Sequence, residues 1–154
     1  MRMTCNWNVL ICGIMLSAGL LAAGPAVAAE IGQIKVAKGT VMVERAGKSI
    51  IGGVGTQVQQ SDVIRTGVNG SVGITFLDNT IMSAGPNSVL SLDRFSFNST
   101  THKGRLDTSL RAGTLSVISG KIAKQSPEAM TVKTPATILG VRGTEFFVQI
   151  GDEK

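Results

Sequence analysis

An alternation of apolar and polar residues with a period of two constrains the fold of this chain more than any other feature. In the segment 71–77, Val72, Ile74 and Phe76 fall on one face. The same spacing recurs at Val41 and Val43, at Leu106, Thr108 and Leu110, and at Phe146, Val148 and Ile150. Period-two alternation is the pattern of half-buried β-strands, whereas amphipathic helices repeat every 3.6 residues.

Turn-forming residues separate these runs at short intervals. Asn69-Gly70 and Asp78-Asn79 predict two-residue hairpins, Gly85–Ser88 predicts a turn, and Ala112-Gly113 separates two further strands. The 19 glycines, 43% hydrophobic residues and only 16% charged residues agree with such a chain. The sequence therefore predicts an all-β single domain of many short strands, as a β-sandwich or a short β-solenoid-like roll. A barrel is the third arrangement that the pattern allows.

One strand departs from simple alternation. Leu90 and Leu92 share a face, while Phe95 and Phe97 fall on the opposite one. A β-bulge near Asp93-Arg94 would bring both pairs into one core, because the extra residue reverses the alternation beyond it. A strand buried on both faces is the alternative, and the two remain equal at this stage.

Two further segments bear on the organisation of the chain. Gly-Thr precedes an alternating run at Gly39, Gly113 and Gly143. We interpret each glycine as a turn and each threonine as the opening of a strand, although a solenoid repeat would give a similar echo. Gln125–Ala129 has no strand pattern and predicts an exposed loop, or one helical turn begun at Ser126-Pro127-Glu128.

The first 28 residues have the three parts of a secretory signal. Arg2 supplies a positive start, an apolar run extends from Val9 to Ala23, and Ala26–Ala28 forms a small-x-small cleavage site. We predict cleavage after Ala28, with Ala29 as the second choice. A membrane anchor is the rival interpretation, but the run is shorter than the ~20 residues that a spanning helix needs. We therefore expect a periplasmic or secreted bacterial protein with no membrane span after cleavage.

The remaining residues carry little of what catalysis requires. Cys5 and Cys12 both lie in the signal segment, so no thiol is left for nucleophilic chemistry or metal binding. His102 is the only histidine and lies in a polar loop. Carboxylates occur singly, and we interpret Asp62 and Asp78 as turn formers. No catalytic, metal-binding or cofactor-binding residue is predicted.

The net charge of +5 at pH 7 raises the question of an anionic partner. One region is locally basic, with Asp107 as its only acid: Lys103, Arg105, Arg111, Lys121 and Lys124. These side chains are interpreted as solvated strand faces, and contact with anionic glycan or lipid head groups is the alternative. Nucleic acid is not expected as a partner, because the chain has no Tyr and its one Trp, Trp7, lies in the signal segment.

From residue 62 onward, an ordered series of motifs is similar to one known family. Residues 62–67 (DVIRTG) match "D-x-I-x-T-G", and residues 71–80 match "S-x-x-x-x-F-x-D-G-S/T", with Asn79 where glycine is usual. Residues 85–90 match a "P-x-S-x-L" turn, and residues 111–115 match "x-x-G-x-L/V". Together with the longer motif described next, these resemble the FecR-like periplasmic domain family over roughly residues 35–150.

The closing motif is the longest and most specific element of the resemblance. Residues 131–136 (TVKTPA) and 140–146 (GVRGTEF) resemble the family's "V-x-T-P-x-A…G-V-R-G-T-x-F". Pro135 favours an extended Thr134 before it. The candidate site residues, for a structural role or a partner contact, are Thr134, Pro135, Gly140, Arg142, Gly143, Thr144 and Phe146.

Within this motif, the backbone and one cation lead to specific expectations. Gly140 and Gly143 are expected to adopt conformations that a Cβ would oppose. The forked donors of Arg142 are expected to tie the turn to a neighbouring strand, or else to contact an anion or a partner. The segment lacks the spacing of a phosphate loop.

The resemblance implies a fold, a compartment and a kind of partner. It implies an all-β domain, here over residues 31–150 with a tail at 151–154, in the periplasm. In the name-giving members this domain follows a membrane helix and an anti-sigma segment, and it senses the signalling domain of an outer-membrane iron–siderophore receptor. Because this sequence shows no cytoplasmic segment before its apolar run, we expect no sigma-factor partner, and the iron-transport role is not carried over.

The sequence thus predicts an exported, non-enzymatic FecR-like domain. We expect it to bind a protein of the cell envelope, either a membrane sensor or a receptor signalling domain, in a signalling role. The alternative is an envelope-glycan-binding or structural module held by the basic face. The final strand is expected either to complete a minimal domain or to leave an exposed edge with which a partner strand could pair.

Overall fold

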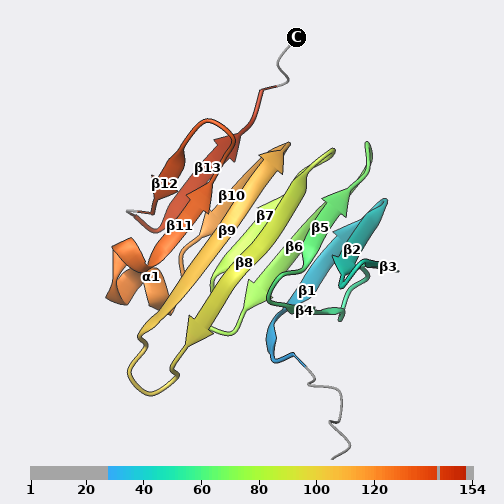
Figure 1. Ribbon diagram of the computed structural model, residues 1–154. Coiled ribbons are helices and arrows are strands. Elements are labelled where there is room, and N and C mark those ends of the chain that lie inside the picture. Colours follow the sequence, from blue (N-terminus) through green and yellow to red (C-terminus); the bar gives the residue numbers. More distant parts are fainter. Residues whose placement is uncertain (1–27, 142, 152–154) are drawn as a thin grey trace, which may run out of the picture.

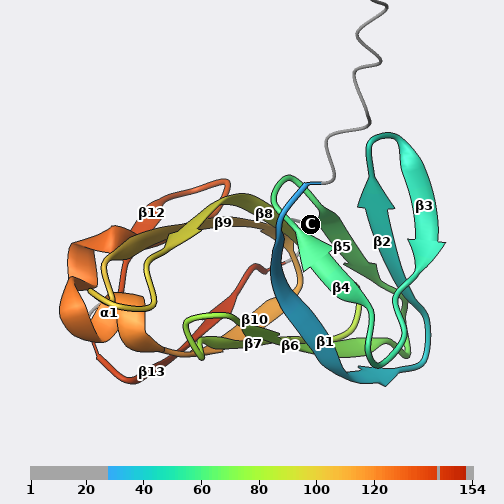
Figure 2. The ribbon, with the colours of Figure 1, turned by 90° about the horizontal axis from the view of Figure 1, so that it is seen from below.

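The strands form two sheets that face each other across one apolar core (Figures 1 and 2). This computed structural model describes residues 28–141 and 143–151. The strands are β1 (Glu30–Lys38), β2 (Val41–Arg45), β3 (Lys48–Ile51), β4 (Gln57–Gln59), β5 (Val63–Thr66), β6 (Ser71–Phe76), β7 (Ile81–Ala84), β8 (Val89–Phe97), β9 (Gly104–Ala112), β10 (Thr114–Ile118), β11 (Met130–Lys133), β12 (Ile138–Gly140) and β13 (Glu145–Gln149). Two short helices, α1 (Lys121–Gln125) and η1 (Pro127–Ala129), follow β10.

The strand order defines a sandwich. Sheet A has the order β13-β10-β7-β6-β1-β4, and sheet B has the order β12-β11-β9-β8-β5-β2-β3. Neighbouring strands are antiparallel except β11, which runs parallel to β9. The predicted all-β single domain is confirmed, and it takes the form of a sandwich rather than a solenoid-like roll.

The core consists of the apolar positions that alternation had placed together. Val72, Ile74 and Phe76 of β6 are buried, and so are Leu106 and Leu110 of β9 from the facing sheet. Of the two alternatives that the sequence left open for β8, the structure shows the bulge, since the register with β9 shifts between Leu92 and Arg94. Beyond that shift Phe95 and Phe97 pack against the same core as Leu90 and Leu92.

The chain passes repeatedly from one sheet to the other, and three of these crossings fall at the turns considered above: residues 67–70 between β5 and β6, residues 85–88 between β7 and β8, and Ala112-Gly113 between β9 and β10. The expectation of a hairpin at Asn69-Gly70 is therefore wrong. The Gly67 amide donates to the Thr40 carbonyl, and Gly70 lies directly against that carbonyl. These contacts direct the chain across to sheet A. Asp78-Asn79 does form the predicted hairpin, because β6 pairs with β7.

Two remaining sequence predictions concern the repeated Gly-Thr pairs and the helical segment that follows β10. Gly39, Gly113 and Gly143 all have positive φ (62°, 85° and 124°), and each precedes a strand, so the interpretation of glycine as the turn is confirmed. The helical turn expected after Ser126 is present as η1. Helix α1 was not predicted, and it takes Gln125 from the expected loop.

Candidate partner-binding groove

The first family motifs form hydrogen bonds that join the two sheets where the chain crosses between them. The Thr66 hydroxyl donates to the Gly85 carbonyl (2.6 Å) and accepts from the Ser88 amide (2.8 Å). The Ser88 hydroxyl in turn accepts from the Thr114 amide at 3.1 Å. Gly113 lies directly against Ser88 with a φ of +85°, so any side chain there would collide. These motif residues therefore have a structural role.

Asp62 opens the family's first motif, and its carboxylate is buried. It is 1% exposed and forms two hydrogen bonds with the Arg45 guanidinium, at 2.9 and 2.7 Å. It also accepts from the Gln59 amide at 2.8 Å. The hydrogen bonds that the guanidinium donates to Asp62 outweigh the burial of Arg45 and raise its pKa. Asp62 thus fixes the turn between β4 and β5, as the sequence predicted, and ties it to β2.

Asp78 and Thr80 are the polar pair of the β6–β7 hairpin motif, at the other end of the sandwich. Both are fully buried. One oxygen of Asp78 accepts from the Thr80 amide (3.1 Å), and the other accepts from the Thr80 hydroxyl (2.6 Å) and the Ile122 amide (3.3 Å). The Asp78 carboxylate thereby anchors the start of α1 to the hairpin, although α1 has no side-chain N-cap of its own.

The closing motif builds the β11–β12 hairpin. The Thr134 amide donates to the Thr137 carbonyl (2.7 Å), and the Thr137 amide donates to the Thr134 hydroxyl (3.1 Å). These bonds close a tight turn over Pro135 and Ala136, both of which are exposed. After β12 the chain crosses to sheet A and forms β13.

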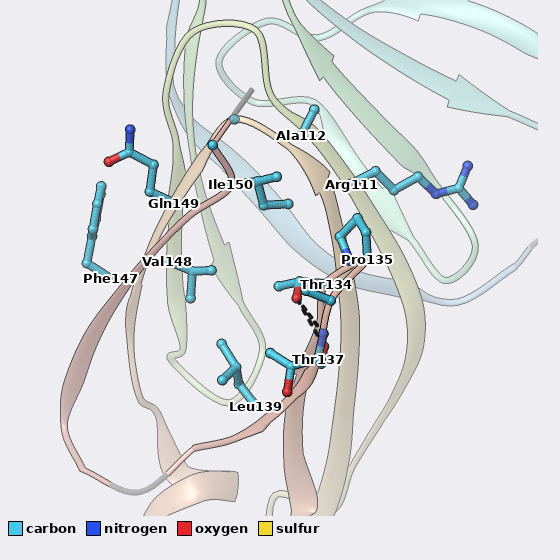
Figure 3. Close-up of a pocket in the computed structure, with 13 residues that line it drawn as sticks. Arg111, Ala112, Thr134, Pro135, Thr137, Leu139, Phe147, Val148, Gln149 and Ile150 are labelled. Atoms are coloured by element: carbon cyan, nitrogen blue, oxygen red, sulfur yellow. Dashed lines mark hydrogen bonds between the residues drawn. The ribbon is translucent and has the colours of Figure 1, made fainter. Parts of the chain in front are cut away.

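An open groove of about 910 Å³ lies between this hairpin and β13 (Figure 3). Leu139, Val148 and Ile150 point into it, whereas Phe147 and Gln149 point away from it on the outer side of β13. The remaining lining is Arg111, Ala112, Gly113, Thr134, Pro135, Ala136, Thr137 and Gly151. The groove therefore has an apolar floor and a largely polar or backbone rim.

The two walls of the groove are the terminal strands of the two sheets. The amide of Ser119 donates to the carbonyl of Thr144, and the amide of Ile150 donates to the carbonyl of Gly113. Because antiparallel hydrogen bonding alternates along a strand, residues 146 and 148 also pair with β10, and residues 145, 147 and 149 turn their backbone groups outward. Among the described residues, no strand pairs with that outer edge.

The edge of β12 is open in the same way. The Thr134 amide bonds to the Thr137 carbonyl, and the Val141 amide bonds to the Met130 carbonyl. The alternation leaves the backbone groups of Ile138 and Gly140 directed away from β11. The groove thus combines an apolar floor with two hydrogen-bonding edges.

The structure places the predicted site residues unevenly around this groove. Thr134 and Pro135 line it. Phe146 packs against the core. Gly143 has the positive φ that was expected, but the expectation for Gly140 is wrong, because it adopts no positive φ and open space lies where a Cβ would stand. Thr144 accepts the Ser119 amide through its carbonyl, which is a backbone contact within sheet A.

Two predictions fall on residues that the structure does not describe. They are the role of Arg142 and the signal segment, of which residues 1–27 lie outside the described ranges. In contrast, the groove includes Leu139, Val148 and Ile150, which the motif did not single out. Alternation marked Val148 and Ile150 as core residues, and only the strand order shows that they lie at the edge of the core.

The basic region does not gather on one surface. Arg105 and Arg111 lie on β9, whereas Lys121 and Lys124 lie on α1. Arg105 is paired with Asp107 at 2.7 Å. Burial would raise the pKa of Asp107, but hydrogen bonds from Arg105 and Thr131 outweigh it and hold that pKa below its usual value. The ion pair also raises the pKa of Arg105.

His102 lies in an exposed loop as expected, with its ring stacked on Phe97 at a centroid distance of 6.3 Å. Within residues 28–141 and 143–151, no three His, Cys, Asp or Glu side chains are grouped as metal ligands would be. Over the same ranges, no helix has the length and apolar character needed to cross a membrane.

Comparison with known proteins bears on the family of the chain. The family model described as FecR protein matches residues 62–154, which is more than half of the sequence. Neither the curated proteins nor the solved structures contain a match to this chain. The matched residues include every motif described above, from Asp62 to the walls of the groove. The chain therefore belongs to the FecR protein family.

Proposed function

We propose that this chain is an exported protein-binding module of the bacterial cell envelope, and that it binds an extended segment of a partner in the groove between β12 and β13. Family membership supports a signalling-related role. The observation that carries the proposal is the groove itself, which joins an apolar floor to the unpaired edge of β13. The expected partner is a membrane sensor or a receptor signalling domain, and no sigma factor is involved.

The mode of binding follows from the geometry of the edge. A strand added to β13 would pair with the outward backbone groups of Glu145, Phe147 and Gln149. Alternate side chains of the added strand would point toward the floor formed by Leu139, Val148 and Ile150. A matching partner therefore presents an extended segment with apolar residues at every second position. Binding of this kind makes and breaks no covalent bonds, in keeping with a non-enzymatic role.

Site-specific photo-crosslinking in living bacteria tests the proposal. A benzophenone amino acid replaces Ala136, an exposed residue that lines the groove. The control carries it at Ile51, an exposed residue of the terminal strand β3 at the far edge of sheet B (81% exposed). We expect a defined protein adduct from position 136 and none from position 51. Equal labelling from both positions, or none from either, would contradict a binding groove.

A proline on the edge of β13 tests the strand-addition mechanism separately. The Gln149 amide points outward, so Gln149→Pro removes a donor needed by an added strand while the bonds to β10 remain. The expected result is loss of the adduct from position 136, with the circular dichroism and melting temperature of the free protein little changed. An undiminished adduct would show that a partner binds the groove without strand pairing.

One observation favours a second function, the binding of anionic envelope glycan. Arg111 and Lys133 are both exposed close to the groove, on strands of sheet B. Electrostatic binding of this kind weakens steeply as salt rises, whereas binding to an apolar groove does not. Retention on wall fragments that falls sharply with salt, and falls again in Lys133→Gln, would favour the glycan.

A further inference from the structure

The outer face of sheet A has an unusual composition for a surface. Three adjacent internal strands, β10, β7 and β6, carry no charged side chain on that face. The outward residues of these strands are Thr114, Ser116, Ile118, Ile81, Ser83, Ser71, Gly73 and Thr75. The outer face of sheet B is instead rich in charge, with Arg65, Arg94, Asp107, Arg111 and Lys133. The two outer faces of the sandwich thus differ in charge, and the middle of the sheet A face is uncharged.

The register of sheet A orders this face into rows that cross the strands. One row runs Phe147, Ser116, Ser83, Gly73, Val36. Its two ends are exposed apolar side chains (Phe147 64%, Val36 48%), and its middle consists of small residues. The adjacent row runs Glu145, Ile118, Ile81, Thr75, Gln33, in which Ile118 and Ile81 are 43% and 39% exposed. The face therefore carries exposed apolar side chains both at its sides, on β13 and β1, and near its centre, on β10 and β7.

The charged residues on the two sides of these three strands have opposite signs. Glu145 lies on β13, and the exposed Lys35 and Lys38 lie on β1. A two-fold axis running along β7 in the plane of an interface would place β13 of one copy over β1 of the other. Glu145 would then lie near Lys35 of the second copy, and Phe147 would lie over Val36. A two-fold axis running across the strands would instead place Lys35 against Lys35.

We propose that a second copy of this chain covers the outer face of sheet A, in a two-fold dimer in which β13 of each protomer lies over β1 of the other. Closed two-fold dimers are the commonest soluble assembly, and stacked sheets are held by side chains between their facing surfaces. In this arrangement the apolar side chains of β13 and β1 contact each other, and each Glu145 faces a lysine. This self-complementary pattern of charge is the reason for proposing a second copy of this chain as the molecule that covers the face.

The dimer is independent of the proposed strand addition. It uses the outward side chains of sheet A, whereas strand addition uses the backbone edge of β13 and the groove beside it. The edge and the groove stay open in the dimer. Failure of either proposal therefore leaves the other in place.

Ser83→Glu tests the dimer, because Ser83 is exposed on β7 and would meet its own copy near the axis. The matched control is Ser96→Glu, at an exposed serine of β8 in sheet B. Sedimentation velocity over a concentration series gives the mass of the purified full-length protein. We expect the unsubstituted protein and Ser96→Glu to have twice the mass of one chain. Ser83→Glu is expected to raise the dissociation constant at least ~10-fold, since facing carboxylates repel.

Exchanging the charges of Lys35 and Glu145 tests the orientation of the two copies, and it requires no substitution near the centre of the sheet. Lys35→Glu is expected to weaken the dimer, and adding Glu145→Lys is expected to restore it. A monomeric unsubstituted protein would overturn the proposal. So would a Ser83→Glu protein that keeps its native circular dichroism and dimerises normally, or a double charge exchange no stronger than Lys35→Glu alone.

Discussion

At the scale of single residues, the family motifs of this chain are chiefly devices that hold the sandwich together. Thr66 and Ser88 join two crossings between the sheets, and Asp78 joins a hairpin to α1. Buried polar groups of this kind cost little while each finds its partner, but the loss of one partner leaves the other unsatisfied. Substitutions at these positions should therefore affect stability before they affect binding.

Asp78→Ala should be the most damaging of these changes. It leaves the Thr80 hydroxyl and the Ile122 amide without their buried acceptor. We expect the free energy of unfolding in urea to fall by about 3 kcal/mol, as is usual for several buried hydrogen bonds lost at once. Thr80→Val should cost less, because Asp78 keeps its bonds from the Thr80 and Ile122 amides and the new losses are the bond between the Thr80 hydroxyl and Asp78 and the bond from the Gly120 amide. A larger cost for Thr80→Val would contradict a leading role for Asp78.

Asn79 occupies the hairpin position where the family usually has glycine, and its φ is +66°. A residue with a Cβ is strained there, and asparagine tolerates the conformation better than most. Asn79→Ala should lower the stability by about 1 kcal/mol. Asn79→Gly should leave it equal or higher. Thermal unfolding of the three proteins measures both effects, and the reverse order would mean that the Asn79 side chain has another role.

Asp107 should make stability depend on acid pH. Its folded-state pKa lies below the usual value, so its contribution is present above about pH 4 and is lost as the pH falls through the folded value. We expect Asp107→Asn to be less stable than the unsubstituted protein near neutrality, and this deficit to shrink below about pH 4. Thr131→Val, which removes one of the bonds, should show the same trend more weakly. Urea unfolding across pH 2–7 tests this, and a pH-independent deficit would contradict it.

At the scale of secondary-structure elements, the strands could be predicted because alternation is local, while their partners could not. The bulge of β8 was predictable, since only a reversal of alternation unites Leu92 with Phe95. The crossing at Asn69-Gly70 was not, because the same two residues can close a hairpin or redirect the chain, and distant Thr40 decides between them. Helix α1 escaped prediction because Asp78, far away in sequence, supplies its N-terminal contact.

Deleting Asp93 should show that the bulge places two aromatic rings in the core. Without the extra residue, Phe95 and Phe97 would turn to the outer face of β8, or the hairpin would lose its register with β9. We expect loss of cooperative unfolding and increased binding of a hydrophobic dye. The control is deletion of Ser99, an exposed residue of the loop that joins β8 to β9. It should unfold almost like the intact protein.

The groove, too, could be predicted only in part from the sequence. The closing motif correctly directed attention to Thr134 and Pro135, which line it. Val148 and Ile150 of its floor could not be predicted, because they follow the same alternation in β13 as residues of the interior. Only the order of the strands shows that nothing among the described residues lies beyond them.

At the scale of the whole molecule, the family match covers less than the folded unit. It begins at residue 62, yet β1 lies between β6 and β4 in sheet A, and β2 pairs with β5 in sheet B. Ile34 and Val43, from this earlier part of the chain, are completely buried. The first four strands are therefore an integral part of the sandwich.

A fragment beginning at residue 62 should consequently not fold by itself. It would expose the apolar residues of β6 and β5 that β1 and β2 now cover, and both sheets would gain open edges. We expect poorly dispersed amide resonances and aggregation, in contrast to a fragment that begins at Ala28. A cooperative thermal transition in the shorter fragment would show that β1–β4 are dispensable.

The pairing of β1 with β6 has a consequence for the rate at which the domain folds. Gly32 lies opposite Phe76, and Lys38 lies opposite Ser71, so sheet A cannot close until much of the chain has been assembled. Domains dominated by such distant pairings fold in milliseconds to seconds, and helical bundles fold far sooner. Under the proposed export, this slow closure would keep the polypeptide unfolded while it passes through a translocation pore, and the sandwich would form only afterwards.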